Sequence, residues 1–393
     1  MGKLLLKRCL EMHLPQGQSA FLWGARKTGK SSYLKATYPH STYYDLLNTE
    51  EQLRLSKAPH LLRQEILALV QANGTQFPVI IDEIQKVPSL LDEVHWLIEN
   101  AGVAFILCGS SARKLKRGAA NLLGGRAWRY HFFPLTSQEL PEWDLLRVFN
   151  HGLLPSHYLL EGSAKKALNS YIEDYLKEEI QAEGLVRNLP AFAHFLDVVG
   201  LCNTEMINYN NVARDCGIGA KTVQAYFEIL QDTLIAYMIP PYVKKIKRDL
   251  ITVRSKFYLF DIGVANRLAK WECEALTGSL AGKSFEHLIL LELMAYKKIH
   301  DRDEGISYWR TQEGYEVDFI IGNAQLAIEV KLGEQIDKRE LKGMAAFLDE
   351  HPHATAYVVC QALRPRLVNL GEHAVHVLPY REFLRRLWDN KLI

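Results

Sequence analysis

The clearest chemical pattern in the chain is a turn rich in glycine and lysine that follows the apolar run SAFLW. The turn, GARKTGKS at 24–31, fits G-x-x-x-x-G-K-[ST], the pattern of a phosphate-binding loop. Its glycines let the backbone fold tightly, so that successive N–H groups face phosphate oxygens, and the start of the next helix adds a positive field. Lys30 is expected to reach the β- and γ-phosphates, and the Ser31 hydroxyl to ligate magnesium. The predicted nucleotide-binding residues are Gly24, Ala25, Arg26, Lys27, Thr28, Gly29, Lys30, Ser31 and Ser32.

A second pattern is an acidic pair at the end of an apolar strand. The segment FPVIIDEIQKV, residues 77–87, ends its apolar run at Asp82 and Glu83. Asp82 is expected to hold the metal through water, and Glu83 to activate the attacking water as a general base. The alternative is a strand that ends in a solvated acidic turn, which the combination of both motifs disfavours. The two patterns together predict binding and cleavage of a nucleoside triphosphate.

The elements that must position these residues are short apolar strands alternating with helical stretches through residues 1–135. The candidate strands are SAFLWG, TYYDL, FPVIID, VAFILCG and RYHFF. Between them, HLLRQEILALVQANG and SLLDEVHWLIENAG have apolar residues three and four apart and end at Gly. This alternation predicts a parallel sheet with helices on its faces. After residue 282 the pattern predicts one helix, three strands, a helix and two further strands.

The middle of the chain has the pattern of a helix-turn-helix. The segment 206–230 reads as two short helices joined by a glycine turn. Lys221, Thr222 and Gln224 are expected to face outward at the start of the second helix, where base edges or phosphates are met. Residues 242–261 are predicted to form a basic β-hairpin, the wing of a winged helix, which suits phosphate contacts that salt weakens. The alternative is that this region contacts a protein and that its lysines form a solvated face. The clustered basic residues are Lys244, Lys245, Lys247, Arg248, Arg254 and Lys256.

A third group of reactive side chains lies on two strands near the C-terminal end. YEVDFIIG presents Asp318, and after a short turn QLAIEVKL presents Glu329 and Lys331. Residues two apart in a strand face the same side, so Glu329 and Lys331 point together, and pairing of the strands brings Asp318 beside them. Two carboxylates and a lysine could hold magnesium, activate water and stabilise the charge of phosphodiester cleavage. Chance alternation of charge on exposed strands is the alternative.

The bulk composition is that of a globular protein with more than one domain, because 393 residues exceed one ordinary core. Lys plus Arg (47) nearly balance Asp plus Glu (45), so any surface for nucleic acid must be local. The six cysteines are scattered without metal-site spacing, which favours free thiols. No apolar run approaches the about 20 residues of a membrane-spanning helix. We therefore expect a cytoplasmic protein without a membrane partner.

Together, GARKTGKS, VIIDE, ILCGSS and GGRAWRYHFFPLT resemble an AAA+-type ATPase. More narrowly, nearly the whole chain resembles a prokaryotic family that joins this ATPase to a C-terminal domain of unknown function related to PD-(D/E)xK nucleases. The resemblance implies ATP and Mg²⁺ as cofactors, a γ-phosphate sensor at Ser110 or Ser111, and a homo-oligomer. It also implies an arginine that acts on the ATP of a neighbouring subunit. Arg126 is the first candidate for this role, and Arg113 and Arg129 are the second choices. The alternative is that Arg126 forms a structural ion pair within its own subunit.

The nuclease resemblance assigns further roles. Asp318, Glu329 and Lys331 are similar to the D…E-x-K part of that pattern, and Glu286 in GKSFEHLILLELM matches its first acidic position. Glu286, Asp318 and Glu329 are therefore the implied metal ligands. Val317 stands where the nuclease pattern has proline, which weakens the match slightly. A domain that keeps the fold and only binds nucleic acid is the alternative.

The expected fold class is α/β. A P-loop NTPase parallel sheet with helices on both faces comes first, followed by a helical and winged-helix segment and a restriction-endonuclease-like α/β domain. The expected parts are an AAA+-type ATPase domain at 1–135, a helical linker at 136–203, a winged helix-turn-helix at 204–265 and a nuclease-like domain at 266–393. The expected function is ATP hydrolysis coupled to the binding and remodelling of DNA, branched or junction DNA included. The alternatives are an ATP-controlled switch that recognises a protein partner and an ATP-gated, metal-dependent nuclease.

Overall fold

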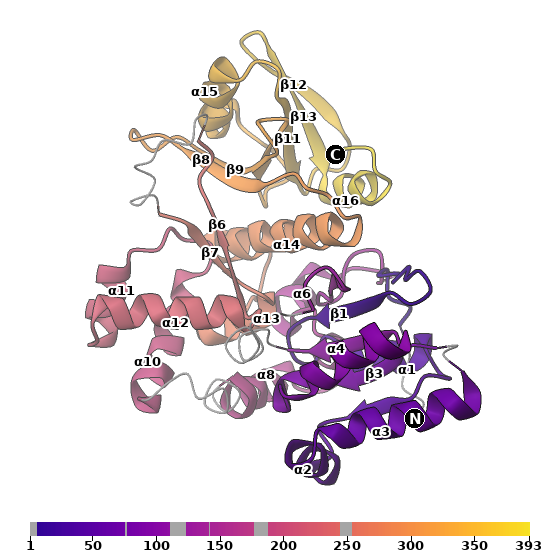
Figure 1. Ribbon diagram of the computed structural model, residues 1–393. Helices are drawn as coiled ribbons and strands as arrows, with labels where there is room; N and C mark the ends of the chain where they lie inside the picture. The colour runs from indigo at the N-terminus through magenta and orange to yellow at the C-terminus, as the bar shows by residue number, and fades with distance from the viewer. Residues whose placement is uncertain (1–5, 75–76, 111–122, 141, 177–187, 244–253) are drawn as a thin grey trace. The chain divides into compact units, whose positions relative to one another are not determined.

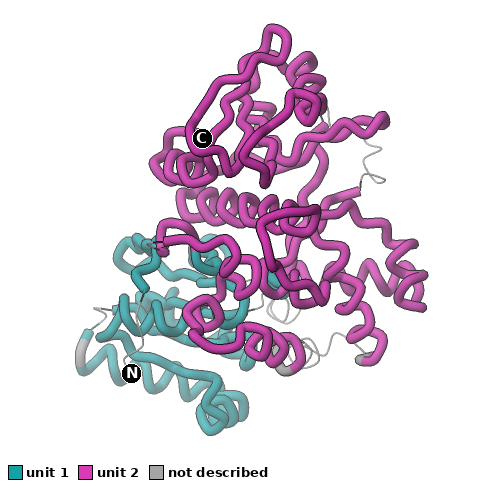
Figure 2. The backbone as a smooth tube through the Cα atoms, turned by 180° about the vertical axis from the view of Figure 1, so that it is seen from behind, with its two compact units in different colours: residues 1–135, 232–235 teal, residues 136–231, 236–393 magenta. Residues whose placement is uncertain are grey.

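The chain forms two compact units, drawn in two colours in Figure 2. The computed structural model describes residues 6–74, 77–110, 123–140, 142–176, 188–243 and 254–393. Unit 1 comprises residues 1–135 and 232–235, and unit 2 comprises residues 136–231 and 236–393. The first break falls where the alternating strand pattern of the sequence stops. The finer boundaries expected after residues 203 and 265 stay predictions.

Unit 1 is built on a five-stranded sheet in which all neighbouring strands are parallel. Its strands are β1 (Ser19–Trp23), β2 (Tyr43–Asp45), β3 (Val79–Asp82), β4 (Phe105–Gly109) and β5 (Ala127–His131). The order β2-β3-β4-β1-β5 puts β4 between the strand that leads into the phosphate loop and the strand that ends in the acidic pair. This sheet, with helices packed against it in Figure 1, agrees with the P-loop NTPase-like fold expected for the N-terminal part.

The helices of unit 1 alternate with the strands. They are α1 (Lys30–Thr37), α2 (Thr49–Lys57), α3 (His60–Asn73) and α4 (Leu90–Ala101), with a short η1 (Ile84–Lys86) after β3. Leu62 and Ile66 of α3 and Val94 of α4 lie in the same buried cluster as the strand side chains. The apolar spacing did not predict α2, whose one buried side chain is Leu55. A helix with so narrow an apolar stripe leaves little periodic signal.

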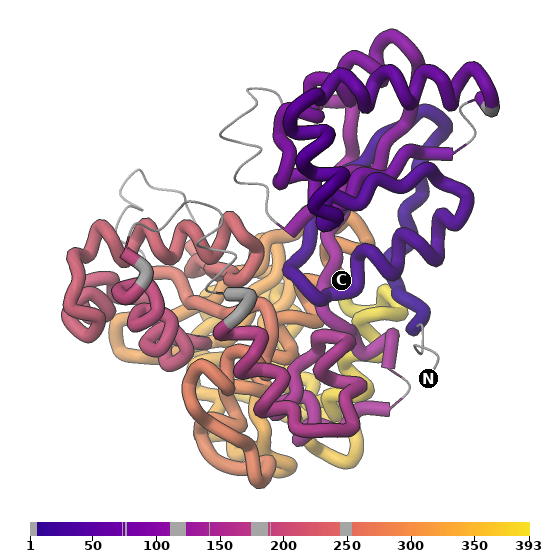
Figure 3. Tube along the Cα trace, turned by 90° about the horizontal axis from the view of Figure 1, so that it is seen from below, coloured from indigo at the N-terminus to yellow at the C-terminus, as the bar shows by residue number. Residues whose placement is uncertain are grey.

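Unit 2 begins with a helical region that can be followed by colour in Figure 3, from magenta to salmon. Its elements are α6 (Leu145–His151), α7 (Pro155–Tyr158), α8 (Ala164–Ser170), η2 (Tyr171–Leu176), α10 (Leu189–Val199), η3 (Gly200–Cys202), α11 (Tyr209–Cys216), α12 (Ala220–Asp232) and α13 (Ile262–Leu268). The two helices α11 and α12 are those expected from the helix-turn-helix pattern. Gly217 ends α11 with a φ of 66°, a left-handed value that favours glycine. Phe195 of α10 packs edge-on against Phe227 of α12 and anchors this pair of helices.

The hairpin after α12 differs from the expected basic wing. Strand β6 (Ala236–Ile239) pairs antiparallel with β7 (Lys256–Leu259), so the first strand begins before the basic run rather than within it. The apolar segment AYMI, which forms β6, lies outside the predicted range of 242–261, because so short an apolar run fits either a helix or a strand. Four residues expected to contact nucleic acid lie outside the described part of the chain: Lys244, Lys245, Lys247 and Arg248.

The C-terminal part of unit 2 is a mixed sheet with helices against it. It comprises α14 (Gly278–Ile299), β8 (Ile306–Arg310), β9 (Glu316–Ile321), β10 (Leu326–Val330), η5 (Lys338–Leu341), α15 (Lys342–Glu350), β11 (Thr355–Cys360), β12 (Arg366–Leu370), β13 (His373–Pro379) and α16 (Tyr380–Trp388). The strand order is β12-β13-β11-β10-β9-β8. Three strands and a helix follow α15, where two strands were expected. The strand β12 is an edge strand with mostly exposed side chains, which blurs its apolar alternation.

A buried carboxylate ties the start of unit 2 to its C-terminal helices. Glu292 of α14 is 1% exposed and accepts hydrogen bonds from the Ser137 N–H at 2.8 Å and the Ser137 hydroxyl at 2.7 Å. It also accepts a bond of 2.7 Å from the indole N–H of Trp388 in α16. Burial raises the pKa of Glu292 to about 7, although these hydrogen bonds oppose the rise. The carboxyl group therefore keeps its proton in the folded protein at pH values where an unfolded chain would lose it.

No helix in the described ranges of the chain combines the length and the apolar character needed to cross a membrane.

Glu292 predicts that unit 2 becomes less stable as the pH rises from 5 to 8. Between the ordinary glutamate pKa and the raised value of about 7, the unfolded chain has released a proton that the folded chain retains, so stability falls with pH. The wild-type free energy of unfolding should drop by about 3 kcal/mol more than that of Glu292→Gln over this range. Urea unfolding followed by tryptophan fluorescence measures both slopes. Parallel pH dependences would contradict the assignment.

Candidate functional site

The phosphate-binding pattern forms the turn between β1 and α1. Gly29 precedes α1 with a φ of 99°, which favours glycine. A side chain on Gly24 would clash, because its Cβ would lie 2.3 Å from the carbonyl oxygen of Phe132. The Thr28 hydroxyl donates to the Ala25 carbonyl at 2.8 Å and closes the loop. Sequence and geometry therefore agree on which glycines of the loop cannot be replaced.

Lys30 lies inside this loop. Its ammonium group is almost fully buried and donates to the carbonyls of Gly24 at 2.7 Å and Ala25 at 3.1 Å. Arg8, which sequence reasoning missed, donates from Nη1 to the Thr28 carbonyl at 2.6 Å and so holds the loop from its other side. The first turn of α1 follows with Ser31 half-buried and Ser32 exposed, while Arg26 and Lys27 are half-buried.

The acidic pair lies at the carboxyl end of β3. Asp82 is 1% and Glu83 6% exposed, so the expectation of a solvated acidic turn does not hold. Glu83 takes a φ of 59°, a left-handed value that is rare for glutamate and is typical of functional sites. The Tyr43 hydroxyl donates to Asp82 Oδ2 at 2.5 Å. Burial, followed by the charge of Asp82, raises the pKa of Tyr43 above its ordinary value, so it stays a donor.

Two polar side chains hold Glu83. The Gln85 amide donates to Glu83 Oε2 and to Ser110 Oγ, the second bond measuring 3.0 Å. Ser110 follows β4 directly, where the γ-phosphate sensor was expected, and Ser111 lies outside the described residues. The close packing needs glycine at Gly109, because a Cβ there would lie 2.5 Å from Gln85 Oε1. Tyr43 and Gln85 are therefore site residues that the motifs did not reveal: Tyr43 opens β2, the strand next to β3, and Gln85 lies in η1 just beyond the carboxyl end of β3.

These residues fit a nucleoside triphosphate and a magnesium ion. The loop supplies backbone N–H groups and one ammonium group, the chemistry that binds phosphate oxygens. The Ser31 hydroxyl and the Asp82 carboxylate are hard oxygen donors, which suit magnesium. Glu83 is a carboxylate next to them and suits proton transfer from water.

The three arginines considered for a trans-acting role differ in their placement. Arg126 forms an ion pair with Glu99 of α4 in the same unit. An ion pair within one subunit was the alternative to a role across subunits. Arg129 is exposed on β5, and Arg113 lies outside the described residues. A role of Arg126 across a subunit interface stays a prediction.

The outward face of α12 carries the polar residues expected there. Lys221, Thr222 and Gln224 are exposed, while Val223 and Phe227 are fully buried and hold the helix in place. The Gln224 amide donates to Glu228 at 3.2 Å.

The C-terminal carboxylates meet at one place in unit 2. Ile328 of β10 pairs with Phe319 of β9, which brings the next residues, Glu329 and Asp318, side by side. Asp318 Oδ2 accepts a hydrogen bond of 2.8 Å from the Val330 N–H.

Two further charged groups of this cluster come from α14 and from the residue that follows β10. Glu286 of α14 joins the cluster, and the Tyr258 hydroxyl donates to it at 2.5 Å. Lys331 Nζ lies 2.7 Å from Glu329 Oε1. The four residues of the nuclease-like pattern are therefore neighbours.

A buried lysine also lies in this cluster and corrects one expectation. Lys256 was grouped with the exposed basic residues of the wing, but it opens β7 and is 4% exposed. Its Nζ lies 3.2 Å from Glu286 Oε1 and 3.7 Å from Asp318 Oδ1, and it also contacts Glu316 Oε1. Sequence reasoning missed both this role of Lys256 and the participation of Glu316. The basic run around Lys256 hid it, because nothing local separates a buried lysine from exposed ones.

Burial dominates the electrostatics of the cluster. It raises the pKa of Glu286 to about 7 and that of Glu329 to about 8, and in both cases the charge of Asp318 adds to the effect. Burial alone would lower the pKa of Lys256, but the carboxylates of Glu286, Asp318 and Glu316 outweigh it and raise that pKa. Within the described ranges, no group of three or more Asp, Glu, His or Cys side chains is arranged to hold a metal ion.

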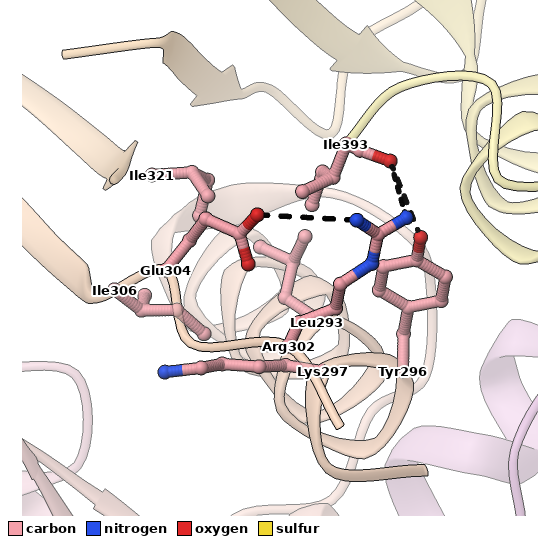
Figure 4. A pocket seen from close by; sticks show the side chains of 8 residues that line it. All are labelled: Leu293, Tyr296, Lys297, Arg302, Glu304, Ile306, Ile321 and Ile393. Atoms are coloured by element: carbon pink, nitrogen blue, oxygen red, sulfur yellow. Dashed lines mark hydrogen bonds and ion pairs between the residues drawn. The ribbon is translucent and has the colours of Figure 1, made fainter. Parts of the chain in front are cut away.

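Two hollows lie in unit 2. A cleft of about 490 Å³ is bordered by Glu286, Asp318 and Lys331 and by the glycine-containing segments 276–278 and 330–333. The other, in Figure 4, measures about 10 Å³, which is room for about one water molecule. It is bordered by Arg302, whose Nη2 donates to the carbonyl of Ile393 at 3.1 Å. The larger cleft is the one next to the carboxylate cluster.

Comparison with known families divides the chain into three matched regions. Residues 16–141 match a family described as an AAA domain. Residues 142–275 match a domain of unknown function (DUF8612), and residues 281–383 match another (DUF4143). An uncharacterized protein of Methanocaldococcus jannaschii is 22% identical over 375 residues, covering 86% of this chain and 80% of that protein. The chain thus has an N-terminal domain of the AAA type, with the ATPase-like character of such domains, followed by regions that match families of unknown function.

Proposed function

We propose that the chain hydrolyses ATP at the carboxyl edge of the unit 1 sheet and uses the reaction to remodel DNA held by unit 2. The observation that carries the ATPase part is the buried set formed by Asp82 and Glu83 and the neutral donors that hold them. Such a set keeps two carboxylates fixed and within reach of a phosphate loop that contains its own lysine. Fixed charges of this kind are what phosphoryl transfer requires, since its catalysis is mostly positioning and electrostatic stabilisation.

The residues divide the chemistry between them. The loop N–H groups and Lys30 bind the β- and γ-phosphates, and Ser31 and Asp82 hold magnesium. When bound, magnesium neutralises charge that develops on the phosphate oxygens. Glu83 takes a proton from the attacking water, and Gln85 and Ser110 keep its carboxylate in one orientation.

For DNA, we propose the outward face of α12 as the contact surface. Three exposed polar residues at its start support this, since the first residues of a recognition helix are those that meet base edges and phosphates. The basic residues that follow β6 in the sequence add positive charge to the same region of the chain. A homo-oligomer with Arg126 acting across subunits belongs to the same proposal.

A second candidate function is an ATP-controlled switch whose unit 2 binds a protein. The formal charge of only +2 and the pairing of Gln224 with the Glu228 carboxylate favour it, because a carboxylate on this face repels phosphates. Stimulation of ATP turnover by single-stranded, duplex or four-way DNA separates the two. A several-fold increase favours the DNA machine, and an unchanged rate with every DNA favours the switch.

Replacing Glu83 by Gln should abolish turnover without abolishing binding. Loss of a general base lowers rates by about 10²–10⁴-fold, while the phosphate loop is untouched. Lys30→Ala should lose both ATP turnover and ATP affinity. Lys57 is an exposed lysine of α2, so Lys57→Ala should keep both turnover and affinity. Phosphate release and binding of a fluorescent ATP analogue measure the two quantities. If wild-type protein shows neither binding nor release at any Mg²⁺ concentration, the proposed ATPase is wrong.

Tyr43→Phe should raise the Mg²⁺ concentration needed for half-maximal turnover. The lost hydroxyl orients Asp82, and a hydrogen bond to a charged group is worth enough to change the requirement about 10-fold. The turnover rate at saturating Mg²⁺ should change less than the Mg²⁺ concentration needed for half-maximal turnover, because Tyr43 positions Asp82 and does not contact the substrate. Tyr44→Phe is the matched control, since its hydroxyl bonds to Glu65 instead. Equal Mg²⁺ curves for all three proteins would exclude this role.

Lys221→Ala should weaken DNA binding and lower its dependence on salt. Each phosphate contact adds about one unit to the slope of log affinity against log salt, so the slope should fall by about 1. Lys165→Ala, which removes an exposed lysine from α8, should leave the slope unchanged. Fluorescence anisotropy with duplex and four-way DNA at several salt concentrations gives both slopes. An affinity of the wild-type protein that does not respond to salt would argue against this surface.

A further inference from the structure

The cluster next to the large cleft of unit 2 contains more positive charge than the nuclease-like pattern requires. Its carboxylates come from α14 (Glu286), β9 (Glu316 and Asp318) and β10 (Glu329). That pattern includes one lysine, which is Lys331 at the end of β10. The other lysine, Lys256, comes from a distant strand, β7, in the region that matches a different family.

Lys256 lies where a cation shared by the carboxylates would lie. Its ammonium group contacts oxygens of Glu286, Glu316 and Asp318. Glu286 and Glu316 lie within hydrogen-bonding distance of the ammonium, and Asp318, at 3.7 Å, adds a further negative charge. The side chain is 5% exposed, and the ring of Tyr308 lies 5.7 Å from Nζ on another side. The position is therefore enclosed, and a cationic group of the protein already occupies it.

The remaining oxygens of the cluster are also poorly suited to a metal ion. Asp318 Oδ2 accepts from the Val330 N–H, and Glu286 Oε1 accepts from both Tyr258 and Lys256. Glu329 Oε1 pairs with Lys331, and its other oxygen is buried without a hydrogen-bond partner among the described residues. Asp318, Glu286 and Glu329 thus each have at least one oxygen that is already engaged by a donor of the protein.

A divalent ion could enter only at a large electrostatic cost. It would lie within a few ångströms of the Lys256 ammonium, and like charges at such distances in a protein interior repel strongly. Expulsion of Lys256 would leave a buried, unpaired ammonium, which is also unfavourable. The residues present thus do not fit the metal ion that the nuclease resemblance implies.

We infer that Lys256 replaces the divalent cation of a nuclease-like site, so that the C-terminal part of unit 2 holds the β6–β7 hairpin in place and does not cleave nucleic acid. The ammonium of Lys256 connects the hairpin to α14 and β9 through ion pairs. This inference is independent of the proposed ATP hydrolysis, because no residue of unit 1 takes part in it.

Titration of Mn²⁺ into the full chain without nucleotide tests the inference. Free Mn²⁺ is followed by electron paramagnetic resonance, with wild type, Asp318→Asn, Lys256→Met and the double variant compared. Wild type and Asp318→Asn should bind Mn²⁺ equally, because the cluster takes none. Lys256→Met should gain one Mn²⁺ per chain, at least tenfold tighter than wild type, and should lose it again in the double variant. Mn²⁺ should also raise the Tm of Lys256→Met and leave that of wild type unchanged.

Lys283→Met provides the matched control. Lys283 lies on α14 close to Glu286 in the sequence but pairs with Glu205, so its removal should produce no Mn²⁺ site. Binding by wild type that disappears in Asp318→Asn would overturn the inference, as would a folded Lys256→Met protein that gains no Mn²⁺. Circular dichroism establishes folding. Should Lys256→Met not fold, the comparison of wild type with Asp318→Asn decides: equal binding supports the inference and unequal binding rejects it.

Discussion

The burial of carboxylates at the ends of strands is the constraint on which both candidate sites depend. A buried carboxylate must receive hydrogen bonds or a cation, because an uncompensated charge away from water is very unfavourable. In unit 1, Asp82 and Glu83 receive hydrogen bonds from a tyrosine and a glutamine, which are neutral. In unit 2, the carboxylates face the ammonium groups of Lys256 and Lys331. Neutral donors orient a carboxylate and leave its charge available to a metal ion, whereas lysines neutralise it. The same constraint thus gives one site suited to magnesium and one already occupied by cations.

The geometry of the unit 1 site follows from strand order and from a few backbone positions. Because β4 lies between β1 and β3, its last residues separate the phosphate loop from the acidic pair. Gly109 there leaves room for Gln85, whose amide donates to the Ser110 hydroxyl that follows the strand. The left-handed backbone of Glu83 costs energy that the surrounding contacts offset. Such a conformation fixes the carboxylate more firmly than a flexible turn could, which suits a general base.

Much of unit 1 could be predicted from sequence, because its signals are local. The five strands are short apolar runs, and the phosphate loop and Asp82–Glu83 lie in fixed order relative to them. Tyr43 and Gln85 could not be recognised, since their role arises only when the fold brings their side chains to Asp82 and Glu83. The elements of unit 2 were harder to predict from sequence. Strand β6 is short, the side chains of β12 are mostly exposed, and α16 follows β13 without a break. Lys256 was wrongly expected to be exposed, because its burial is decided by contacts with residues far along the chain and not by the basic run around it.

The position of Lys256 also bears on how ATP hydrolysis in unit 1 could act on unit 2. A nuclease gated by ATP needs a cluster that can exchange its lysine for a metal ion. That exchange requires β7 to move, since Lys256 opens this strand and pairs with Ile239 of β6. Phe257, the next residue, is fully buried and packs edge-on against Phe227 of α12, so the strand cannot move alone. Displacing Lys256 would therefore disturb the helix-turn-helix core as well. This coupling favours a unit 2 in which the hairpin, the α11–α12 pair and the C-terminal sheet move together.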